Sequence, residues 1–388
     1  MHELLWLLLP VAAASGWFMA RRSSDAAPGR RGAELSADYF KGLNYLLNEQ
    51  PDEAIEVFIR MLEVDSDTVE THLALGNLFR RRGEVDRAIR IHQNLIARPT
   101  LSKQQRTDAL LELGQDYMRA GLFDRAESLF QELIENNVHT AVASRQLLAI
   151  YQQEKDWERA IRTARQLESM TGQPMSPTIA QFYCELADEA LGAHDQGRAQ
   201  QMVKRALSHD RNCVRASMMQ GDMAREAGDW RGAIRAYRRV AEQDIEFLPE
   251  VIPSMRACYE EQGNPGAMID YLYHVLERYD GVSPMLTLAE LLVRQQGEAA
   301  AARFIADQLK RRPSVRGLER LIELNLGYSE GEARENLLIL RSLVGQLLED
   351  KPVYKCLNCG FAGKSLHWQC PSCKRWNTIK PIHGVEGE

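Results

Sequence analysis

Four cysteines near the end of the sequence have the type and spacing of a metal site. They form two Cys-x-x-Cys pairs separated by ten residues: Cys356, Cys359, Cys370 and Cys373. Each pair fits a tight turn, and two such pairs can direct four thiolates at one ion with tetrahedral geometry. Because four protein ligands leave no open coordination position, the pattern predicts a structural or electron-carrying site and not a hydrolytic one.

A pair of disulfides, or four unligated thiols, is the alternative interpretation of these cysteines. The chain holds seven cysteines, and the other three lie scattered in apolar, helical surroundings: Cys184, Cys213 and Cys258. We interpret those three as small buried residues and not as bridges, since this usage does not indicate an oxidising compartment. His367 lies between the two pairs and is a further candidate ligand. With four thiolates present, we expect it to be a neighbouring polar side chain instead.

The identity of the metal stays open between zinc and iron, since four sulfur ligands suit both. The two pairs resemble the knuckles of rubredoxin, although Lys374 follows the second pair where glycine is usual, and the spacer is shorter. Gly360, after the first pair, suits a turn that needs a positive φ. We predict that residues 351–388 form a rubredoxin-like four-cysteine domain. One metal ion would supply most of its folding energy, because so short a segment cannot bury a core of its own.

A repeat with a period near 34 residues precedes the cysteines and fills residues 34–350. Its clearest copy places a small residue, a ring, an alanine and a second ring at relative positions 0, 3, 12 and 16: Gly42, Tyr45, Ala54 and Phe58. The pattern recurs from Gly76, Gly114 and Gly221 and, in weaker form, in five other places. This is the signature of tetratricopeptide repeats (TPRs), so we predict an all-α superhelical solenoid of about nine helix pairs.

The residue sizes in the repeat have a packing explanation. Glycine at the first position lets the two helices of a pair approach closely, and alanine leaves room where the second helix crosses. One helix pair cannot bury its own apolar face, whereas a stack of pairs can. We therefore interpret the rings as packing positions and not as a cofactor site, and we expect His92, which stands at a ring position, to be packed as well.

The charge distribution argues against nucleic acid as a partner. The formal net charge is −6 and the isoelectric point is about 5.9, so the chain lacks a global basic field. Two basic runs, Arg80–Arg82 and Lys310–Arg312, lie at predicted helix ends. We interpret both runs as solvated groups that complement the helix dipole, with phosphate binding as the alternative.

Residues 1–20 have the features of a transmembrane anchor. The segment from residue 4 to residue 20 is uncharged and carries Trp6 and Trp17 near its ends, and its Pro10 is tolerated in a membrane span. Arg21 and Arg22 follow, which predicts that the rest of the chain faces the cytoplasm. A cleaved signal peptide is the alternative, but the basic residues lie on the wrong side for one. Residues 21–33 read as a linker.

We find no motif in the sequence that predicts catalysis. The segment GFAGKS, residues 360–365, resembles part of a phosphate-binding loop, but Asn358 occupies the position of its first glycine and no strand is predicted before it. The acidic residues follow the surface period of helices and form no isolated acid–base pair. We therefore predict that the protein is not an enzyme and has neither a small-molecule substrate nor a nucleic-acid partner.

Three features follow one another in this chain: an N-terminal span ending in Arg21-Arg22, about nine TPRs, and the motifs C-L-N-C-G and W-Q-C-P-S-C. This order resembles the lipopolysaccharide assembly protein B family (LapB, also called YciM) of Gram-negative bacteria. The resemblance implies a single-pass protein of the cell inner membrane, facing the cytoplasm, that regulates lipopolysaccharide biosynthesis. The implied partners are the FtsH protease, the LpxC deacetylase whose proteolysis it promotes, YejM (PbgA) and lipopolysaccharide assembly proteins. The implied metal ligands are the four cysteines of the two pairs.

Two other functions share these sequence features. One is a rubredoxin-like redox or metal-sensing protein, and the other is a general assembly scaffold for cell-envelope enzymes. The place of the metal domain is also open: it either caps the last repeat or offers a second docking surface. Trp368 and Trp376 correspondingly either anchor an interface or pack beneath the metal site.

Overall fold

The computed structural model describes residues 37–48, 50–64 and 69–388. The chain divides into two compact units, residues 1–146 and residues 147–388. The predicted anchor, residues 1–20, and the linker, residues 21–33, lie outside the described residues. Of the helices that are described, none combines the length and the apolar character that a membrane crossing requires.

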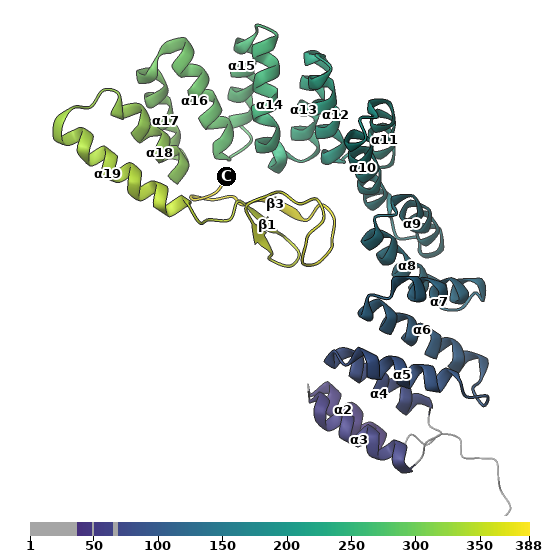
Figure 1. Ribbon diagram of the computed structural model, residues 1–388. Helices are drawn as coiled ribbons and strands as arrows, with labels where there is room; N and C mark the ends of the chain where they lie inside the picture. The colour runs from purple at the N-terminus through teal and green to yellow at the C-terminus, as the bar shows by residue number, and fades with distance from the viewer. Residues whose placement is uncertain (1–36, 49, 65–68) are drawn as a thin grey trace, which may run out of the picture. The chain divides into compact units, whose positions relative to one another are not determined.

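Paired helices make up most of both units (Figure 1). The first unit contains α2 (Ala37–Leu47), α3 (Pro51–Val64), α4 (Val69–Arg82), α5 (Val85–Ile96), α6 (Lys103–Ala120) and α7 (Phe123–Glu135). Helix α8 (Thr140–Glu154) crosses the division between the units. The second unit continues with α9 (Trp157–Thr171), α10 (Ser176–Gly192), α11 (Gln196–His209), α12 (Val214–Glu226), α13 (Trp230–Gln243), the 3-10 turn η2 (Ile245–Phe247), α14 (Leu248–Glu261), α15 (Pro265–Leu276), α16 (Val282–Gln296), α17 (Glu298–Arg311), α18 (Val315–Leu326) and α19 (Gly331–Leu348). The helices described from α2 to α19 thus form nine consecutive pairs, in agreement with the repeat.

Local sequence signals account for the ends of these helices. Asp156, Asp195 and Asp229 each accept a hydrogen bond from the backbone N–H three residues later, which caps the second helix of a pair. Gly121 ends α6 in the left-handed conformation, with φ of 74°, where a side chain would be strained. These signals place the turns between paired helices.

Each clear repeat is held together by a ring packed on a glycine sixteen residues earlier. A Cβ atom built on the glycine would lie 2.4–2.6 Å from the nearest ring atom in the pairs Gly42–Phe58, Gly76–His92, Gly114–Phe130 and Gly221–Tyr237. The alanine of the same pattern is fully buried in each of these copies, for example Ala54 and Ala126. The predicted close approach of the two helices is confirmed.

His92 is packed as expected, and it belongs to a buried polar group. Its Nδ1 lies 2.5 Å from Oδ2 of Asp116, and both side chains are fully buried. Oδ1 of the same carboxylate accepts a hydrogen bond from Arg80 at 2.8 Å. The prediction that the whole basic run is solvated is therefore wrong at Arg80, because its long side chain reaches into the next repeat.

Arg312 departs from the prediction in the same way. Its guanidinium donates to the backbone oxygens of Leu276, at the end of α15, and of Tyr279. This contact does complement the C-terminus of a helix, but the helix belongs to the preceding repeat. The three cysteines outside the pairs, by contrast, are buried and unbridged as predicted: Cys184, Cys213 and Cys258.

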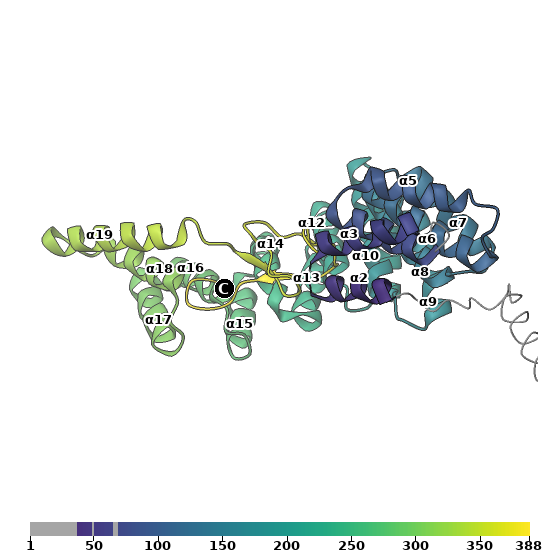
Figure 2. The ribbon, with the colours of Figure 1, turned by 90° about the horizontal axis from the view of Figure 1, so that it is seen from below.

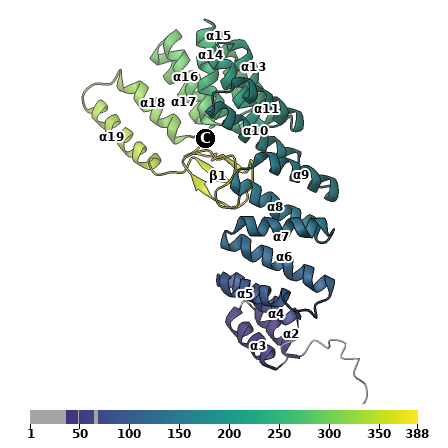
Figure 3. The ribbon, with the colours of Figure 1, turned by 45° about the vertical axis from the view of Figure 1, so that its right-hand side comes forward.

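A small antiparallel sheet follows the last helix. Its strands β1 (Tyr354–Cys356), β2 (Ala362–Gly363) and β3 (Ile379–Pro381) are arranged in the order β2-β1-β3. Tyr354 is paired with Gly363 on one side and with Pro381 on the other. In Figures 1 and 3 the helices of the second unit curve around this sheet, which lies on their inner side.

We expect Gly221→Ala to destabilise the second unit by about 1–3 kcal/mol, because the added methyl group would overlap the ring of Tyr237. Gly345→Ala is the matched control: a Cβ there, in α19, meets nothing within 4 Å. It should instead stabilise by about 0.5–1 kcal/mol, through loss of backbone entropy in the unfolded chain. Urea unfolding followed by circular dichroism compares the two. Equal midpoints for both variants would contradict the packing argument.

Candidate metal centre and its seat on the repeats

The structure brings together the side chains of the two Cys-x-x-Cys pairs. All four sulfur atoms lie within 4.8 Å of one another: those of Cys356, Cys359, Cys370 and Cys373. Sγ of Cys356 is 3.8 Å from Sγ of Cys373, and Sγ of Cys359 is 3.6 Å from Sγ of Cys370. Sulfur ligands at about 2.3 Å from a tetrahedral ion are about 3.8 Å apart. The spacing of the donors therefore suits one zinc or iron ion.

The two pairs lie on turns with the same backbone hydrogen bonds. In the first turn Gly360 N donates to Cys356 O, and Cys356 N donates to Phe361 O, at 3.0 and 2.7 Å. The second turn repeats both bonds: Lys374 N donates to Cys370 O, and Cys370 N donates to Arg375 O, each at 2.9 Å. Gly360 has φ of 79°, and Lys374 has φ of 59° at the equivalent position. The second knuckle thus keeps its shape without glycine, at a cost of roughly 1–2 kcal/mol for the left-handed residue.

The surroundings of the sulfur atoms differ from one another. The Thr378 hydroxyl is 3.3 Å from Cys356 Sγ and is the main reason that the pKa of this thiol falls to about 6. A hydrogen bond from the Arg375 backbone lowers the pKa of Cys373, while burial raises the pKa of Cys370 to about 11. A bound cation would favour the thiolate at every position, including that of Cys370, whose pKa burial raises.

His367 does not belong to the group of close donors. Its Nε2 is 3.1 Å from the Ser365 hydroxyl, and its ring packs edge-on against Phe361, with the ring centres 6.3 Å apart. These contacts agree with the expectation of a neighbouring polar side chain.

Trp376 attaches the metal domain to the repeats. Its indole Nε1 donates to Oε1 of Gln152, in α8, at 2.9 Å. The same ring packs edge-on against Trp157 and Phe182, with ring centres 6.2 and 5.8 Å away. A single side chain of the metal domain thus contacts α8, α9 and α10.

Trp368 makes a second attachment, further along the repeats. Its ring stacks on Phe247 with 5.4 Å between the ring centres. The guanidinium of Arg215, in α12, lies 5.9 Å from the centre of the Trp368 ring and is held in place by Glu185 and Asp188. Because this guanidinium is both paired and buried, it presents a fixed cation to the ring.

Two polar residues of the sheet complete the contact. Lys380 forms ion pairs with Asp244 and Glu246 and lies 4.5 Å from the ring centre of Phe247. The Tyr354 hydroxyl donates to Oε1 of Glu250 at 2.7 Å. Figure 2 shows this part of the chain, in yellow, alongside α12, α13 and α14. The sequence contains no local signal for these pairs, since their partners lie more than 100 residues away.

The segment after β3 binds the beginnings of two helices. The Glu388 carboxylate accepts hydrogen bonds from the backbone N–H and the hydroxyl of Ser283, at 2.8 and 2.7 Å, in the first turn of α16. The Val385 carbonyl accepts from the N–H of Val315, the first residue of α18, at 2.7 Å. Both acceptors satisfy N–H groups that a helix leaves without partners in its first turn.

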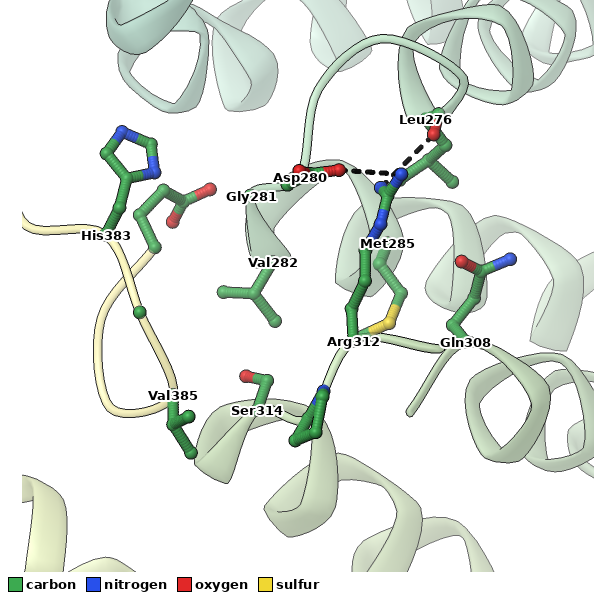
Figure 4. Close-up of a pocket in the computed structure, with 13 residues that line it drawn as sticks. Leu276, Asp280, Gly281, Val282, Met285, Gln308, Arg312, Ser314, His383 and Val385 are labelled. Atoms are coloured by element: carbon green, nitrogen blue, oxygen red, sulfur yellow. Dashed lines mark hydrogen bonds and ion pairs between the residues drawn. The ribbon is translucent and has the colours of Figure 1, made fainter. Parts of the chain in front are cut away.

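A cavity of about 250 Å³ lies between this segment and the helices (Figure 4). Its apolar wall includes Val282, Met285 and Val385. Its two labelled charged groups, Asp280 and Arg312, are paired with each other at 2.6 Å. The cavity therefore belongs to the seat of the C-terminal segment, and its charged pair is engaged within the protein.

Known proteins match the chain over its whole length. Residues 354–381 match the rubredoxin metal binding domain, and residues 71–106, 111–173 and 184–246 match tetratricopeptide repeats. Lipopolysaccharide assembly protein B of Escherichia coli K12 is 42% identical over 388 residues, which is 100% of each chain. The protein of the same name from Haemophilus influenzae is 36% identical, again over 100% of both chains.

The chain belongs to the lipopolysaccharide assembly protein B family. The resemblance noted in the sequence is thereby confirmed, and the names of its relatives support a role in lipopolysaccharide assembly. Among solved structures, the C-terminal part of a TPR repeat-containing protein from Cytophaga hutchinsonii is 13% identical, covers 70% of this chain and 93% of its own, and gives a TM-score of 0.36.

The metal domain of this family member docks along the first helices of several pairs of its own unit, and in the last pair its C-terminal segment contacts only the start of α18 among the contacts described above. Within the described residues, the outer face of α19 remains exposed, since Ile339, Leu343 and Leu347 are each more than half accessible. Trp368 and Trp376 are the anchors of this docking, so they face the repeats and do not pack beneath the metal site. The interface that they anchor is internal to the chain.

We expect Trp376→Ala to loosen the docking without removing the metal site, because the indole contacts three helices and supplies none of the four sulfur atoms. Amide hydrogen exchange of residues 354–381 and of α10 should become faster than in the unaltered chain. Leu357→Ala is the matched control, since that side chain is 72% exposed in the same domain. Unchanged exchange in Trp376→Ala would show that the tryptophan does not hold the domain in place.

Proposed function

We propose that the protein is a non-enzymatic adaptor at the inner membrane that limits lipopolysaccharide synthesis by promoting proteolysis of the LpxC deacetylase by FtsH. The observation that carries the proposal is the metal domain fixed to the inner face of a TPR unit. This arrangement joins two kinds of protein-binding surface, the TPR helices and the metal domain, in one compact unit. The family membership supplies the connection to lipopolysaccharide assembly.

The adaptor acts through local concentration. Two partners that bind the same scaffold meet at an effective concentration far above their concentrations in the cell, without any new chemistry. TPR helices present side chains along an extended surface, which suits the binding of a folded or an extended client. The protease would then act on a client that the scaffold holds nearby.

The tether is the second part of the proposal. An apolar stretch from residue 4 to residue 20, followed by Arg21 and Arg22, supports a single span with the repeats on the cytoplasmic side. A membrane tether would hold the scaffold beside a membrane-bound protease and beside YejM (PbgA). The general assembly scaffold differs from this adaptor only in its clients.

The third part of the proposal is that the four cysteines bind one structural metal ion. The domain buries little besides two of these cysteines and Ile379, so its fold needs a further source of free energy. A metal ion would supply it through the four thiolates, as in other small metal-stabilised domains. The docking described above adds contacts that an isolated domain of this size would lack.

We expect the purified chain to contain one ion of zinc or iron per molecule by mass spectrometry of the metal. Cys370→Ser should lose most of this metal and speed amide exchange in residues 351–388, because this sulfur is fully buried in the cluster. Cys258→Ser, at a buried cysteine outside the cluster, should keep the metal. A visible iron–thiolate band with reversible reduction would favour the redox alternative. Full metal content in Cys370→Ser would exclude this cysteine as a required ligand.

Depletion of the protein should lengthen the cellular half-life of the LpxC deacetylase several-fold, because the client would lose its route to the protease. A pulse–chase measurement follows the deacetylase with and without depletion, and a plasmid copy of the unaltered gene should restore the short half-life. A half-life that depletion leaves unchanged would refute the adaptor and leave a scaffold with other clients.

A further inference from the structure

The first unit contains an open hollow of about 490 Å³ that the metal domain does not line. It is formed by α4, α6 and the first part of α8, which are the first helices of three successive pairs. Its lining consists of three arginines, two amides and one thioether: Arg80, Arg81, Arg119, Gln115, Gln146 and Met118. All of these residues belong to the first unit.

Arg80 forms a fixed part of this lining. Its guanidinium donates to the carboxylates of Glu112 and Asp116, at 2.6 and 2.8 Å, and to Oε1 of Gln115 at 3.0 Å. The Asp116 carboxylate is fully buried and also contacts His92. Since these two carboxylates are occupied by Arg80 and His92, they do not compete for the other two arginines.

Arg81 and Arg119 are the cations left for a ligand. Both side chains are exposed, and within residues 37–48, 50–64 and 69–388 neither has a side-chain hydrogen bond or an ion pair. They come from α4 and α6 and line the same hollow. A guanidinium presents its donors in a planar fork that matches a carboxylate.

We propose that this hollow binds an acidic segment of a protein partner, with Arg81 and Arg119 each paired to a carboxylate of the segment. The amides of Gln115 and Gln146 can donate to and accept from a peptide backbone. Met118 offers an adaptable apolar surface for a side chain between the two acidic residues. The hollow thus combines two cations with groups that suit an extended peptide.

The charge of the whole chain favours a short acidic segment over a larger polyanion. The chain carries a net charge of −6, which repels nucleic acid or an anionic membrane surface over long distances. Charges beyond about 8–10 Å are screened at physiological salt, so a short segment responds mainly to the two nearby guanidinium groups. This inference deepens the proposed function, because it specifies the chemistry of a client segment.

The test selects random twelve-residue peptides displayed on phage against the full chain in detergent. Three versions of the protein are compared: the unaltered chain, the double variant Arg81→Glu/Arg119→Glu, and Arg90→Glu. The control residue Arg90 is exposed on α5 and does not line the hollow. Thermal unfolding followed by circular dichroism confirms that all three are folded.

The unaltered chain and the Arg90→Glu control should enrich peptides that carry two or more Asp or Glu residues, and the double variant should not. A selected peptide, labelled with fluorescein, should bind the double variant at least tenfold more weakly, since two charge-assisted contacts are lost. Its affinity for the unaltered chain should fall as salt is raised from 50 to 300 mM. The Arg81→Gln/Arg119→Gln pair should weaken binding by less than the charge reversal.

The proposal is overturned if the unaltered chain enriches no acidic peptides or if the double variant enriches them equally. It is also overturned if a labelled single-stranded oligonucleotide binds in an Arg81- and Arg119-dependent way while the acidic peptide does not. These outcomes are distinct from failure of the adaptor function, which is measured by deacetylase half-life. If the adaptor recognises its client at another surface, depletion would still lengthen the half-life of the deacetylase, but the chain would not enrich acidic peptides.

Discussion

The contact between a ring and a glycine sixteen residues earlier is the constraint on which the solenoid depends. It fixes how closely the two helices of a pair approach, because no side chain fits between Gly114 and Phe130 or between Gly221 and Tyr237. A pair built in this way still has an apolar face to bury, and only the next pair can cover it. Side chains on the first helices of several pairs remain available for other contacts. In the four clear repeats the stacking of the solenoid therefore rests on a packing rule within the helix pair.

The metal domain uses this available surface inside the second unit. Its contacts begin at Gln152 in α8 and extend to Val315 in α18, with Arg215, Glu250 and Ser283 between them on α12, α14 and α16. Each of these residues belongs to the first helix of a pair. A domain with three short strands could not bury enough apolar area to fold alone. The docking contacts supply part of what its core lacks, and a metal ion on the four cysteines would supply more. The two contributions would come from different parts of the domain, the metal from the sulfur atoms and the docking from the tryptophan rings.

The sequence reveals the repeats and the cysteine group because both are local patterns. The glycine and ring of a repeat are sixteen residues apart, and the cysteines of a pair are three apart, so each pattern is visible within a short window. The docking of the metal domain has no such pattern, since Trp376 and Gln152 are separated by 224 residues. The same reason explains why the prediction failed for Arg80 and Arg312. Their positions at helix ends indicate solvated side chains, but their partners lie on a neighbouring repeat, far away in the sequence. What the sequence does not show is which long-range surfaces meet.

The two units use the same kind of surface in different ways. In the second unit, the first helices of the pairs bind aromatic and cationic side chains of the chain's own metal domain, including Trp368 and Lys380. In the first unit, the equivalent helices keep two unpaired guanidinium groups beside a hollow. Unpaired cations repel one another and contribute nothing to the stability of the unit, whereas Arg80, which lies between the helices, is fully paired. The proposed acidic segment, whose charge is opposite, would account for this arrangement.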